Sequence, residues 1–220
     1  MISVVIPTLN AESVLAPTLA ALVPAVVGGQ VQEAILADGG SSDDTRVISD
    51  AAGTVLIDVS RGRASQLAAG AAQARGDWLL FLEANAVLEP GWAEEAQAFI
   101  ERVESGRRGQ AAAFFRYALD DDGFMPRLAE LVARMSCFLF AMPGENQAML
   151  ISRKLYDRLG GFRKDDRLVH RLKRSEMVML NSRAVTGAPL HRSEGYVTPT
   201  LRQLGQALLS PVRALARLYG

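Results

Sequence analysis

Two side chains that could bind a metal ion follow a strongly apolar run of the sequence. The run "GDWLLFL" ends at Leu82, and the next residues, "EANAVLEPGW", place Glu83 and Asn85 two positions apart before a turn at Pro90 and Gly91. Carboxylate and amide oxygens both bind hard divalent cations, although the amide lacks the charge that makes a carboxylate a strong ligand. The spacing therefore leaves three interpretations: a metal site, a weakened metal site, or an ordinary loop.

A second polar cluster, "DGGSSDDT", begins at Asp38 and follows another apolar run. An aspartate carboxylate can accept hydrogen bonds from a base N–H or a ribose hydroxyl, and glycines let the backbone approach a ligand. A helix predicted to open at about Thr45 would present its N-terminus to negative charge. The same pattern is typical of a capped turn, so on its own it leaves nucleoside recognition and a structural turn as equal alternatives.

Short strands and helices alternate along the first part of the chain and would position these clusters. Apolar runs predict strands at "ISVVIPT", "VQEAILAD", "GTVLIDVS" and "DWLLFLEA". Helices are predicted after Asn10 as an N-cap, from about Thr45, and across "GRASQLAAGAAQARG" with a stop at Gly76. This order predicts an α/β fold with an open, mostly parallel sheet and helices on both faces. Ligands of such sheets bind beyond the carboxyl ends of the strands, where polar clusters fall four times, at residues 7–12, 38–44, 61–63 and 83–85.

The rest of the chain continues the mixture of helices and strands. An amphipathic helix is predicted after Pro90, a strand in "AAAFFRYALDDDG", and a helix in "MPRLAELVARMSCFLFAM". A short strand and a helix that stops at Gly160 and Gly161 come next, then a basic helix in "RKDDRLVHRLKR" and a short strand in "MVMLNS". Without a repeat or a linker, the pattern predicts one domain over residues 1–195 and a C-terminal tail over residues 196–220.

The predicted tail is amphipathic and basic. Apolar residues recur at helical spacing, Arg202, Arg213 and Arg217 lie among them, and no acidic residue follows Glu194. Such a helix would pack on the domain, on a second subunit of a homo-oligomer, or on an anionic membrane surface. We favour packing over membrane contact.

Charge is balanced overall but unevenly distributed. Residues 1–60 contain seven Asp or Glu and one arginine, whereas residues 151–220 contain fourteen Lys or Arg and five Asp or Glu. The asymmetry indicates either an anionic partner or a solvated basic surface. Nucleic-acid binding is not expected, because the basic segment is not interleaved with aromatic residues. The chain also lacks the glycine-rich motifs of P-loop NTPases and dinucleotide dehydrogenases.

The expected compartment follows from three features of the sequence. One cysteine, Cys137, offers neither a disulfide framework nor a Cys-rich zinc site and favours a reducing environment. The start, "MISVVIPTLN", lacks the basic and apolar regions of a signal peptide. No run approaches the roughly 18 apolar residues of a membrane-spanning helix. We expect a cytoplasmic protein, with membrane association only through the tail.

Several of these motifs together resemble the family 2 glycosyltransferases. They are "VVIPTLNAE", "DGGSSDDT", "RGRASQLAAGAAQARGDWLLFLEANAVLEPG" and the "GGF" before the basic segment, and they cover most of residues 2–175. The "RGRA" stretch is similar to that of a compact bacterial subgroup. The resemblance implies a GT-A fold, a UDP- or GDP-sugar donor, Mn²⁺ or Mg²⁺ as cofactor, and inverting transfer to an acceptor of unknown identity.

The resemblance also implies roles for individual residues. Asp38 would hold the base, and Arg63 would lie near the nucleotide. Glu83 and Asn85 stand where the family has Asp-x-Asp, whose first carboxylate contacts the ribose or sugar and whose last binds the metal that bridges the diphosphate. The nucleoside end of the pocket would be lined by Pro7, Thr8, Asn10 and Glu12.

Residues later in the chain would complete the site. Gln147 in "GENQ" falls near the acceptor by the same resemblance, and Asp165 or Asp166 would act as the general base that deprotonates it. Alternatively, these two aspartates only balance neighbouring basic residues on an exposed turn. His191 would supply a late metal ligand, although a lone histidine is more often a satisfied loop residue.

Three departures from the family pattern leave the activity open. Asn85 replaces a metal-binding carboxylate, Asn146 stands where Asp is expected, and the Glu-Asp pair that normally supplies the base is missing. The chain is therefore either a glycosyltransferase with altered chemistry or a nucleotide-sugar-binding homologue with weak or no catalysis. A nucleotidyltransferase is the least favoured class, because "PTLNAE" after the first strand contains neither glycine nor a basic residue.

Overall fold

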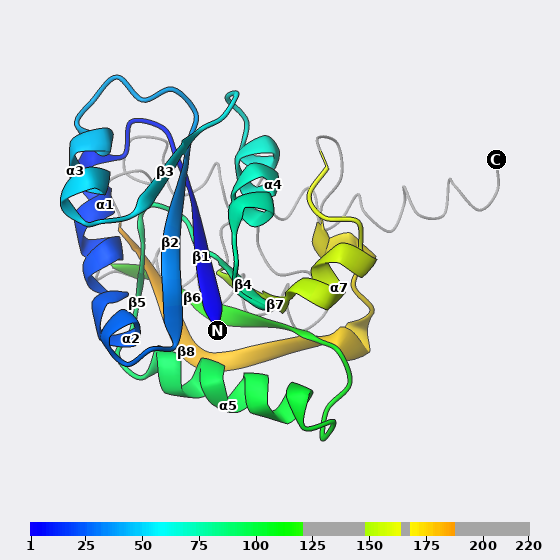
Figure 1. The fold of residues 1–220 in the computed structure, drawn as a ribbon. Coiled ribbons are helices and arrows are strands. Elements are labelled where there is room, and N and C mark those ends of the chain that lie inside the picture. The colour runs from blue at the N-terminus through cyan, green and yellow to red at the C-terminus, as the bar shows by residue number, and fades with distance from the viewer. Residues whose placement is uncertain (121–147, 164–167, 188–220) are drawn as a thin grey trace, which may run out of the picture.

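The computed structural model of the chain describes residues 1–120, 148–163 and 168–187, and one eight-stranded sheet runs through them (Figure 1). The strand order is β3-β2-β1-β4-β7-β6-β8-β5. The strands are β1 (Ile2–Thr8), β2 (Val31–Asp38), β3 (Val55–Asp58), β4 (Trp78–Phe81), β5 (Ala86–Leu88), β6 (Ala112–Asp120), β7 (Met149–Ser152) and β8 (Met177–Gly187). The described α-helices are α1 (Glu12–Ala20), α2 (Val23–Val27), α3 (Thr45–Ala51), α4 (Arg63–Gln73), α5 (Trp92–Glu104) and α7 (Arg153–Arg158).

One half of the sheet is parallel and the other half is mixed. β1 pairs in parallel with β2 and β4, and β2 with β3, so the carboxyl ends of these four strands lie at one edge. β7 is antiparallel to β4 and β6, β8 is parallel to β6, and β5 is antiparallel to β8. The strand order reverses between β1 and β4, which is the position where sheets of this kind bind ligands.

Two apolar layers cover the two faces of the sheet. On one face, Ile2, Val4 and Ile6 pack in a cluster with residues of α1, α2 and α5, whereas Val5 on the other face packs with α4 and α7. Figure 1 shows α1 and α3 on one side of the parallel strands and α4 on the other. Because side chains alternate along a strand, burial on both faces explains the continuous apolar sequence of β1. The predicted α/β fold, a mostly parallel sheet with helices on both faces, is confirmed.

Helix α4 lies directly on the parallel strands. A Cβ atom at Gly70 would lie 2.3 Å from Val5 Cγ1, so this close approach requires glycine. The guanidinium of Arg153, the first residue of α7, covers the C-terminal end of α4. It donates to three carbonyls there, those of Ala71, Ala74 and Gly76. Both contacts fix the axis of α4, and therefore the position of its N-terminus at the carboxyl edge of the sheet.

The start of α1 differs from the prediction. The helix begins at Glu12, and its N-cap is Ala11 without a side-chain hydrogen bond. Asn10, predicted to be the N-cap, has a left-handed backbone conformation with φ 51°. The prediction was wrong because the Asn10 side chain binds a neighbouring loop instead of its own helix.

The predicted strands and helices after β3 also need local corrections. The strand expected to continue through Ala84 ends at Phe81, and the separate strand β5 follows the next turn. Helix α4 ends at Gln73, before the predicted stop at Gly76. Within the described residues, the predicted basic helix is replaced by two 3₁₀ turns, Leu168–Arg171 and Arg174–Glu176. The strand expected in "MVMLNS" extends to Gly187, because it pairs with both β5 and β6.

Helices in the described part of the chain are short. The longest, α5, has 13 residues, whereas a membrane-spanning helix needs about 20. Among the described residues, no helix combines the length and the apolar character required to cross a bilayer. The helix predicted in "MPRLAELVARMSCFLFAM" and the tail over residues 196–220 lie outside these residues.

Candidate functional site

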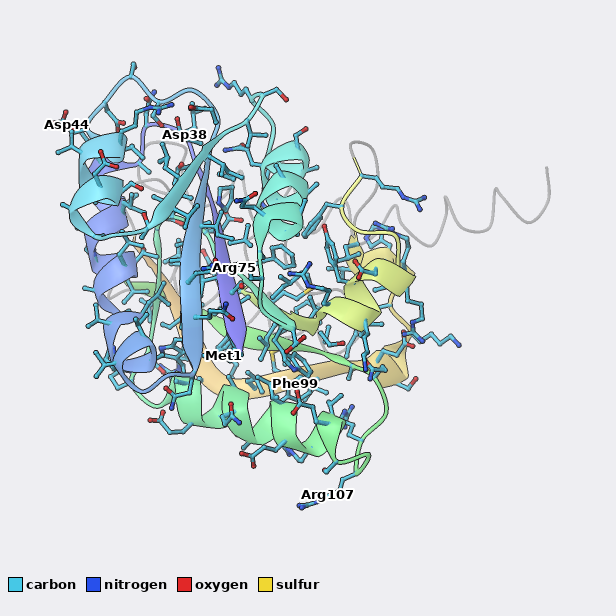
Figure 2. The ribbon with its side chains drawn as sticks, in the orientation of Figure 1. Met1, Asp38, Asp44, Arg75, Phe99 and Arg107 are labelled. Atoms are coloured by element: carbon cyan, nitrogen blue, oxygen red, sulfur yellow. The ribbon has the colours of Figure 1, made fainter. Side chains whose placement is uncertain are left out.

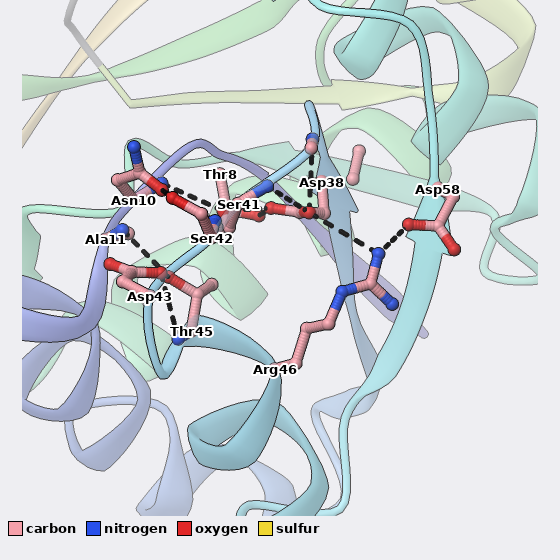
Figure 3. Close-up of polar contacts among 12 residues, drawn as sticks. Thr8, Asn10, Ala11, Asp38, Ser41, Ser42, Asp43, Thr45, Arg46 and Asp58 are labelled. Atoms are coloured by element: carbon pink, nitrogen blue, oxygen red, sulfur yellow. Dashed lines mark hydrogen bonds and ion pairs between the residues drawn. The ribbon is translucent and has the colours of Figure 1, made fainter.

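The ends of β1, β2 and β3 bring polar side chains into register. Thr8 pairs with Asp38, and Asp38 pairs with Asp58, across the two parallel ladders. Arg46 on α3 forms an ion pair with Asp58, and its Nη2 atom lies 3.7 Å from Asp38 Oδ2 (Figure 3). The Asp38 side chain is fully buried, whereas 70% of the Asp58 side chain is exposed. The outermost carboxylate of this row is therefore the one that solvent and ligands reach.

The Asp38 carboxylate organises the loop that follows β2. Oδ1 accepts hydrogen bonds from the hydroxyls of Thr8 (3.0 Å) and Ser41, and Oδ2 accepts from the backbone N–H groups of Ser41 (2.8 Å) and Gly40 (3.2 Å). Burial alone raises the pKa of Asp38, but the hydrogen bonds from Ser41, Thr8 and Gly40 outweigh it and lower the pKa below its ordinary value. A carboxylate has about four lone-pair positions, so these contacts occupy the accepting capacity of Asp38.

Asn10 joins the loop after β1 to the loop after β2. Its backbone N–H donates to Ser41 Oγ (2.8 Å), and its Oδ1 accepts from the Ser42 N–H (2.9 Å), as Figure 3 shows. The left-handed conformation of Asn10 lets both groups face the same loop, and asparagine tolerates this conformation better than most residues. Asn10 therefore fixes the two loops relative to each other.

Glu12 and Asp43 extend the connection between the same loops. The Glu12 N–H donates to Asp43 Oδ2 (3.0 Å), while Glu12 Oε2 accepts from the Asp44 N–H (2.8 Å). Asp43 Oδ1 also accepts from the Thr45 N–H (3.1 Å) at the start of α3. Each loop thus satisfies backbone N–H groups of the other, and we refer to residues 10–12 and 41–45 with these contacts as the loop lattice.

Gln66 is a positioning residue that the sequence analysis missed. It lies on α4, is 6% exposed, and its Nε2 donates to the carbonyls of Thr8 and Ala37, at 2.7 Å each. It therefore ties the ends of β1 and β2 together from the α4 side of the sheet. The signal was present, since Gln66 precedes Leu67 and lies one helical turn before Gly70, which places it on the buried face of α4.

The Glu83-Ala84-Asn85 sequence forms a turn held at both ends. The Leu82 N–H donates to the Val5 carbonyl (3.0 Å), which extends the pairing of β4 with β1 up to the turn. The Ala86 N–H then donates to the Glu83 carbonyl (3.1 Å) and closes the turn. This geometry confirms that the segment lies at the carboxyl end of β4, beside the end of β1.

Arg63 and Glu83 form an ion pair at this edge. Arg63 Nε donates to Glu83 Oε1 (2.7 Å), and Nη2 donates to the same oxygen. Arg63 is the first residue of α4, and Gly62 before it has φ 143°, a conformation that favours glycine. The Arg63 side chain is 44% exposed and that of Glu83 is 22% exposed. The ion pair is therefore partly exposed at the carboxyl edge of the sheet.

The described side chains do not fit a hard divalent cation well. Within residues 1–120, 148–163 and 168–187, no group of three or more His, Cys, Asp or Glu is arranged to hold a metal ion. Glu83 is paired with Arg63, and Asn85 offers a neutral amide oxygen, which is a weaker ligand than a carboxylate. Asn85 therefore lies where a metal was expected, in surroundings that favour a metal only weakly.

The predicted site residues divide into two groups. The structure brings seven of the predicted nucleotide and metal residues to the carboxyl edge of the sheet: Thr8, Asn10, Glu12, Asp38, Arg63, Glu83 and Asn85. Pro7 is buried within β1 near the same edge. Four other predicted residues lie outside the described part of the chain: Gln147, Asp165, Asp166 and His191.

A family model described as "Glycosyl transferase family 2" matches residues 3–162 of the chain. A search of curated protein sequences gave no significant match. The family match covers every residue of the loop lattice, the Arg63–Glu83 pair and the turn at Asn85.

Solved structures of glucosyl-3-phosphoglycerate synthase from Mycobacterium tuberculosis are similar in fold. The complex with Mn²⁺, UDP-glucose and phosphoglyceric acid has a TM-score of 0.62 and 22% sequence identity, with 96% of this chain and 79% of the other covered. The complex with Mg²⁺ and UDP has a TM-score of 0.61 and 22% identity, with 96% and 78% covered. The expected GT-A fold is confirmed by this likeness.

Proposed function

The chain belongs to glycosyl transferase family 2, and on that premise we propose that it transfers a sugar from a nucleoside-diphosphate sugar to an acceptor hydroxyl. One observation carries this proposal: the loops after β1 and β2 are joined by polar contacts, and the turn after β4, paired with Arg63 at the start of α4, lies at the same edge of the sheet. Solved structures of similar fold contain UDP or UDP-glucose together with Mn²⁺ or Mg²⁺. These support a UDP-sugar as the first donor to test, with a GDP-sugar as the alternative.

We assign the nucleoside to the surface of the loop lattice. The contacts of Asn10 and Glu12 hold both loops in one conformation, so little further ordering is needed when a ligand binds. Asp38 lies beneath this surface with its accepting positions occupied. Its proposed role is therefore to shape the backbone that contacts the base, with Thr8 as its partner on β1.

The chemical step uses residues of the second half of the chain. The acceptor oxygen forms a bond to C1 of the sugar while the bond from C1 to the diphosphate oxygen breaks, which inverts the configuration at C1. The acceptor proton passes to a carboxylate, for which we propose Asp165 or Asp166, and the nucleoside diphosphate leaves with the bonding electron pair. Gln147 is proposed to contact the acceptor.

A second function is favoured by the side chain at the metal position. The neutral Asn85 and the pairing of Glu83 with Arg63 are compatible with a homologue that binds a nucleotide sugar but transfers it slowly or not at all. In this case the loop lattice still binds the nucleotide, and the fold serves to recognise the donor.

A donor survey separates the two functions. The purified chain is incubated with UDP-glucose, UDP-galactose and GDP-mannose, with and without Mn²⁺, and the released UDP or GDP is measured; UDP binding is measured by calorimetry. Release from one donor class supports the transferase, and an Asp165→Asn/Asp166→Asn variant should then lose release but retain UDP binding. Binding of UDP without release from any donor supports the second function. Neither binding nor release contradicts both.

A further inference from the structure

We propose that the C-terminal tail, residues 196–220, docks as an amphipathic helix in a groove formed by α1, α2 and α3 of the same chain. The groove reaches from the later parts of α1 and α3 to the starts of β2 and β3. Figure 2 shows Arg75, one of the lining residues, displaced from Asp38 toward Met1. The inference therefore goes beyond the proposed function, because this surface lies away from the loops that we assign to the nucleotide.

The groove is open, mostly apolar and has a volume of about 620 Å³. Its apolar lining includes Leu19 of α1, Val23 and Val26 of α2, Ile48 of α3 and Val55 of β3. Val23 is 54% exposed and Val26 is 49% exposed, although burial of valine side chains against a partner is favourable. A segment that covers both valines would therefore be held there by the hydrophobic effect.

Three polar side chains of the lining already have partners. Glu33 accepts a hydrogen bond from the Ser3 hydroxyl (2.7 Å) and forms an ion pair with Arg75 (2.9 Å). The Thr54 and Ser49 hydroxyls share a hydrogen bond of 2.7 Å. A site for a polar small molecule presents polar groups that converge on the ligand. Because these groups pair with their neighbours instead, the groove favours a row of apolar side chains.

The tail has apolar side chains at the spacing that such a groove can bind. Leu201, Leu204 and Leu208 stand at positions i, i+3 and i+7, which places them on one face of the predicted helix. Recognition of a helix in an apolar groove uses anchors at this spacing. All three leucines precede Pro211, before which a helix usually ends. Residues 201–208 are therefore the part of the tail that we assign to the groove.

Opposite charges on the tail and on the elements of the groove favour their contact. Residues 12–58, from α1 to β3, contain seven Asp or Glu and one arginine, whereas residues 196–220 contain three arginines and no Asp or Glu. Asp50 is exposed on α3, directly before the lining residue Ala51. Charges of opposite sign steer association and exclude wrong partners. The tail is therefore matched better by this surface than by residues 151–187, which contain ten Lys or Arg and four Asp or Glu.

The end of β8 lies within reach of the groove. β8 pairs with β5 up to Thr186, and α1 contacts the turn before β5, where the Thr18 hydroxyl donates to the carbonyl of Ala84 (2.8 Å). The next residue of α1, Leu19, lines the groove. An extended segment the length of residues 188–195 spans up to about 29 Å, whereas a helix with its side chains is about 10–12 Å across. This linker is therefore long enough to carry the tail around α1.

The test is hydrogen–deuterium exchange of the tail in the full chain, with Val26→Lys and Val27→Lys as a matched pair. In the wild type, the amides of residues 201–208 should exchange at least about tenfold more slowly than in an unstructured peptide. Val26→Lys puts a positive charge into the groove and repels the basic tail, so this protection should be lost. Val27→Lys adds the same charge at the neighbouring residue, which is 84% exposed and is not part of the lining, so protection should stay. Equal melting temperatures show that both variants are folded.

A change in the tail itself gives a second check that leaves α2 intact. Leu204→Lys places a charge on the apolar face of the tail, so the tail should leave the groove and the amides of α2 should exchange faster. Gln206→Lys is the control, because Gln206 lies on the opposite face of the predicted helix. Its effect on exchange in α2 and in the tail should be small.

Several outcomes would overturn the inference. If residues 201–208 of the wild type exchange as fast as an unstructured peptide, or are protected only by vesicles of anionic phospholipid, the tail does not dock on the domain. If protection disappears on dilution together with a fall in the mass measured by light scattering, the tail docks on a second copy. If Val26→Lys leaves the protection intact, or Val27→Lys removes it equally, this groove is not the docking site. Protection that persists in a monomer and is lost only in Val26→Lys supports the inference.

Discussion

Thr18 on α1 donates a hydrogen bond of 2.8 Å to the carbonyl of Ala84, the central residue of the Glu83-Ala84-Asn85 turn. The Thr18 side chain is fully buried, so this bond forms in a low-dielectric environment. The contact links α1, the helix after β1, to the turn after β4. It therefore fixes the position of the turn that contains Glu83 and Asn85 at the carboxyl edge of the sheet.

Removal of this bond should disturb the turn more than the helix. Thr18→Val keeps the shape of the side chain but leaves the Ala84 carbonyl without this donor, and we expect a loss of about 1–3 kcal/mol in the free energy of unfolding. UDP affinity should also fall, because the turn that contains Glu83 and Asn85 would be held less firmly at the edge of the proposed site. Chemical denaturation and calorimetry measure the two effects. Thr18→Ser keeps the hydroxyl, so this variant should retain most of the stability and most of the UDP affinity. If Thr18→Val and Thr18→Ser lose the same amount of stability, the hydrogen bond does not have this role.

Replacement of Asp38 should destabilise the loop after β2. In Asp38→Asn, one carboxylate oxygen becomes an NH₂ group that faces backbone or hydroxyl donors, and we expect a cost of about 1–3 kcal/mol in urea unfolding. Asp50→Asn is the control, because Asp50 is exposed and lies near the C-terminal end of α3, outside the loop lattice. A loss of UDP affinity without any change in stability would instead show that Asp38 contacts the base directly.

Gln66 should hold the ends of β1 and β2 in position relative to each other. Gln66→Leu removes the donor to the carbonyls of Thr8 and Ala37, and we expect a loss of about 1–3 kcal/mol in the free energy of unfolding for leaving a buried acceptor unsatisfied. Hydrogen exchange of the residue 39–42 amides should become faster in the variant. Gln73→Leu, at the other end of α4, serves as the control; unchanged exchange in Gln66→Leu would contradict the proposed connection.

Glu95 gives a test based on pH. Its carboxylate accepts from both backbone N–H groups and both side chains of Asn181 and Ser182, in an irregular part of the β6–β8 pairing. Burial raises the pKa of Glu95, but these hydrogen bonds outweigh burial and lower the pKa below its ordinary value of 4.5. A lowered pKa stabilises the fold above that value, and this stabilisation is lost as pH falls through the pKa of the folded state.

Glu95→Gln should therefore destabilise the protein at neutral pH by about 1–3 kcal/mol. The difference in the free energy of unfolding between Glu95→Gln and the wild type should become smaller as the pH falls below 4.5. Urea unfolding over a pH series measures this, with Glu94→Gln as the exposed neighbour for control. A difference that stays constant with pH would show that the charge of Glu95 does not matter.

Local patterns predicted most of the fold, because the relevant information lies within single segments. The buried run of β1 and the helical spacing of α4 specify their elements directly. β5 was missed because it has three residues and exists through pairing with β8, which lies far away in the sequence. In the described part of the basic segment, 3₁₀ turns replace the expected helix, and Arg171 donates to the distant carbonyls of Leu159 and Gly161.

The candidate site was predicted in its position but not in its internal contacts. The rule that ligands bind at strand ends located Asp38 and Asn85 correctly at one edge. The pairing of Arg63 with Glu83 depends on how α4 lies against β1, and no local pattern encodes that distance. Some expectations stay predictions. These are the packing of the tail over residues 196–220 and the roles of four residues, Gln147, Asp165, Asp166 and His191.

The loop lattice also bears on the order of events during synthesis. Every hydrogen-bonding partner within it, and the Asp38 cluster beneath it, comes from residues 8 to 46. These residues all precede β3, so their contacts become available to a nascent chain before β7 and Arg153 leave the ribosome. The loops at the carboxyl ends of β1 and β2, which we propose bind the nucleotide, can thus begin to assemble before the later strands join the sheet.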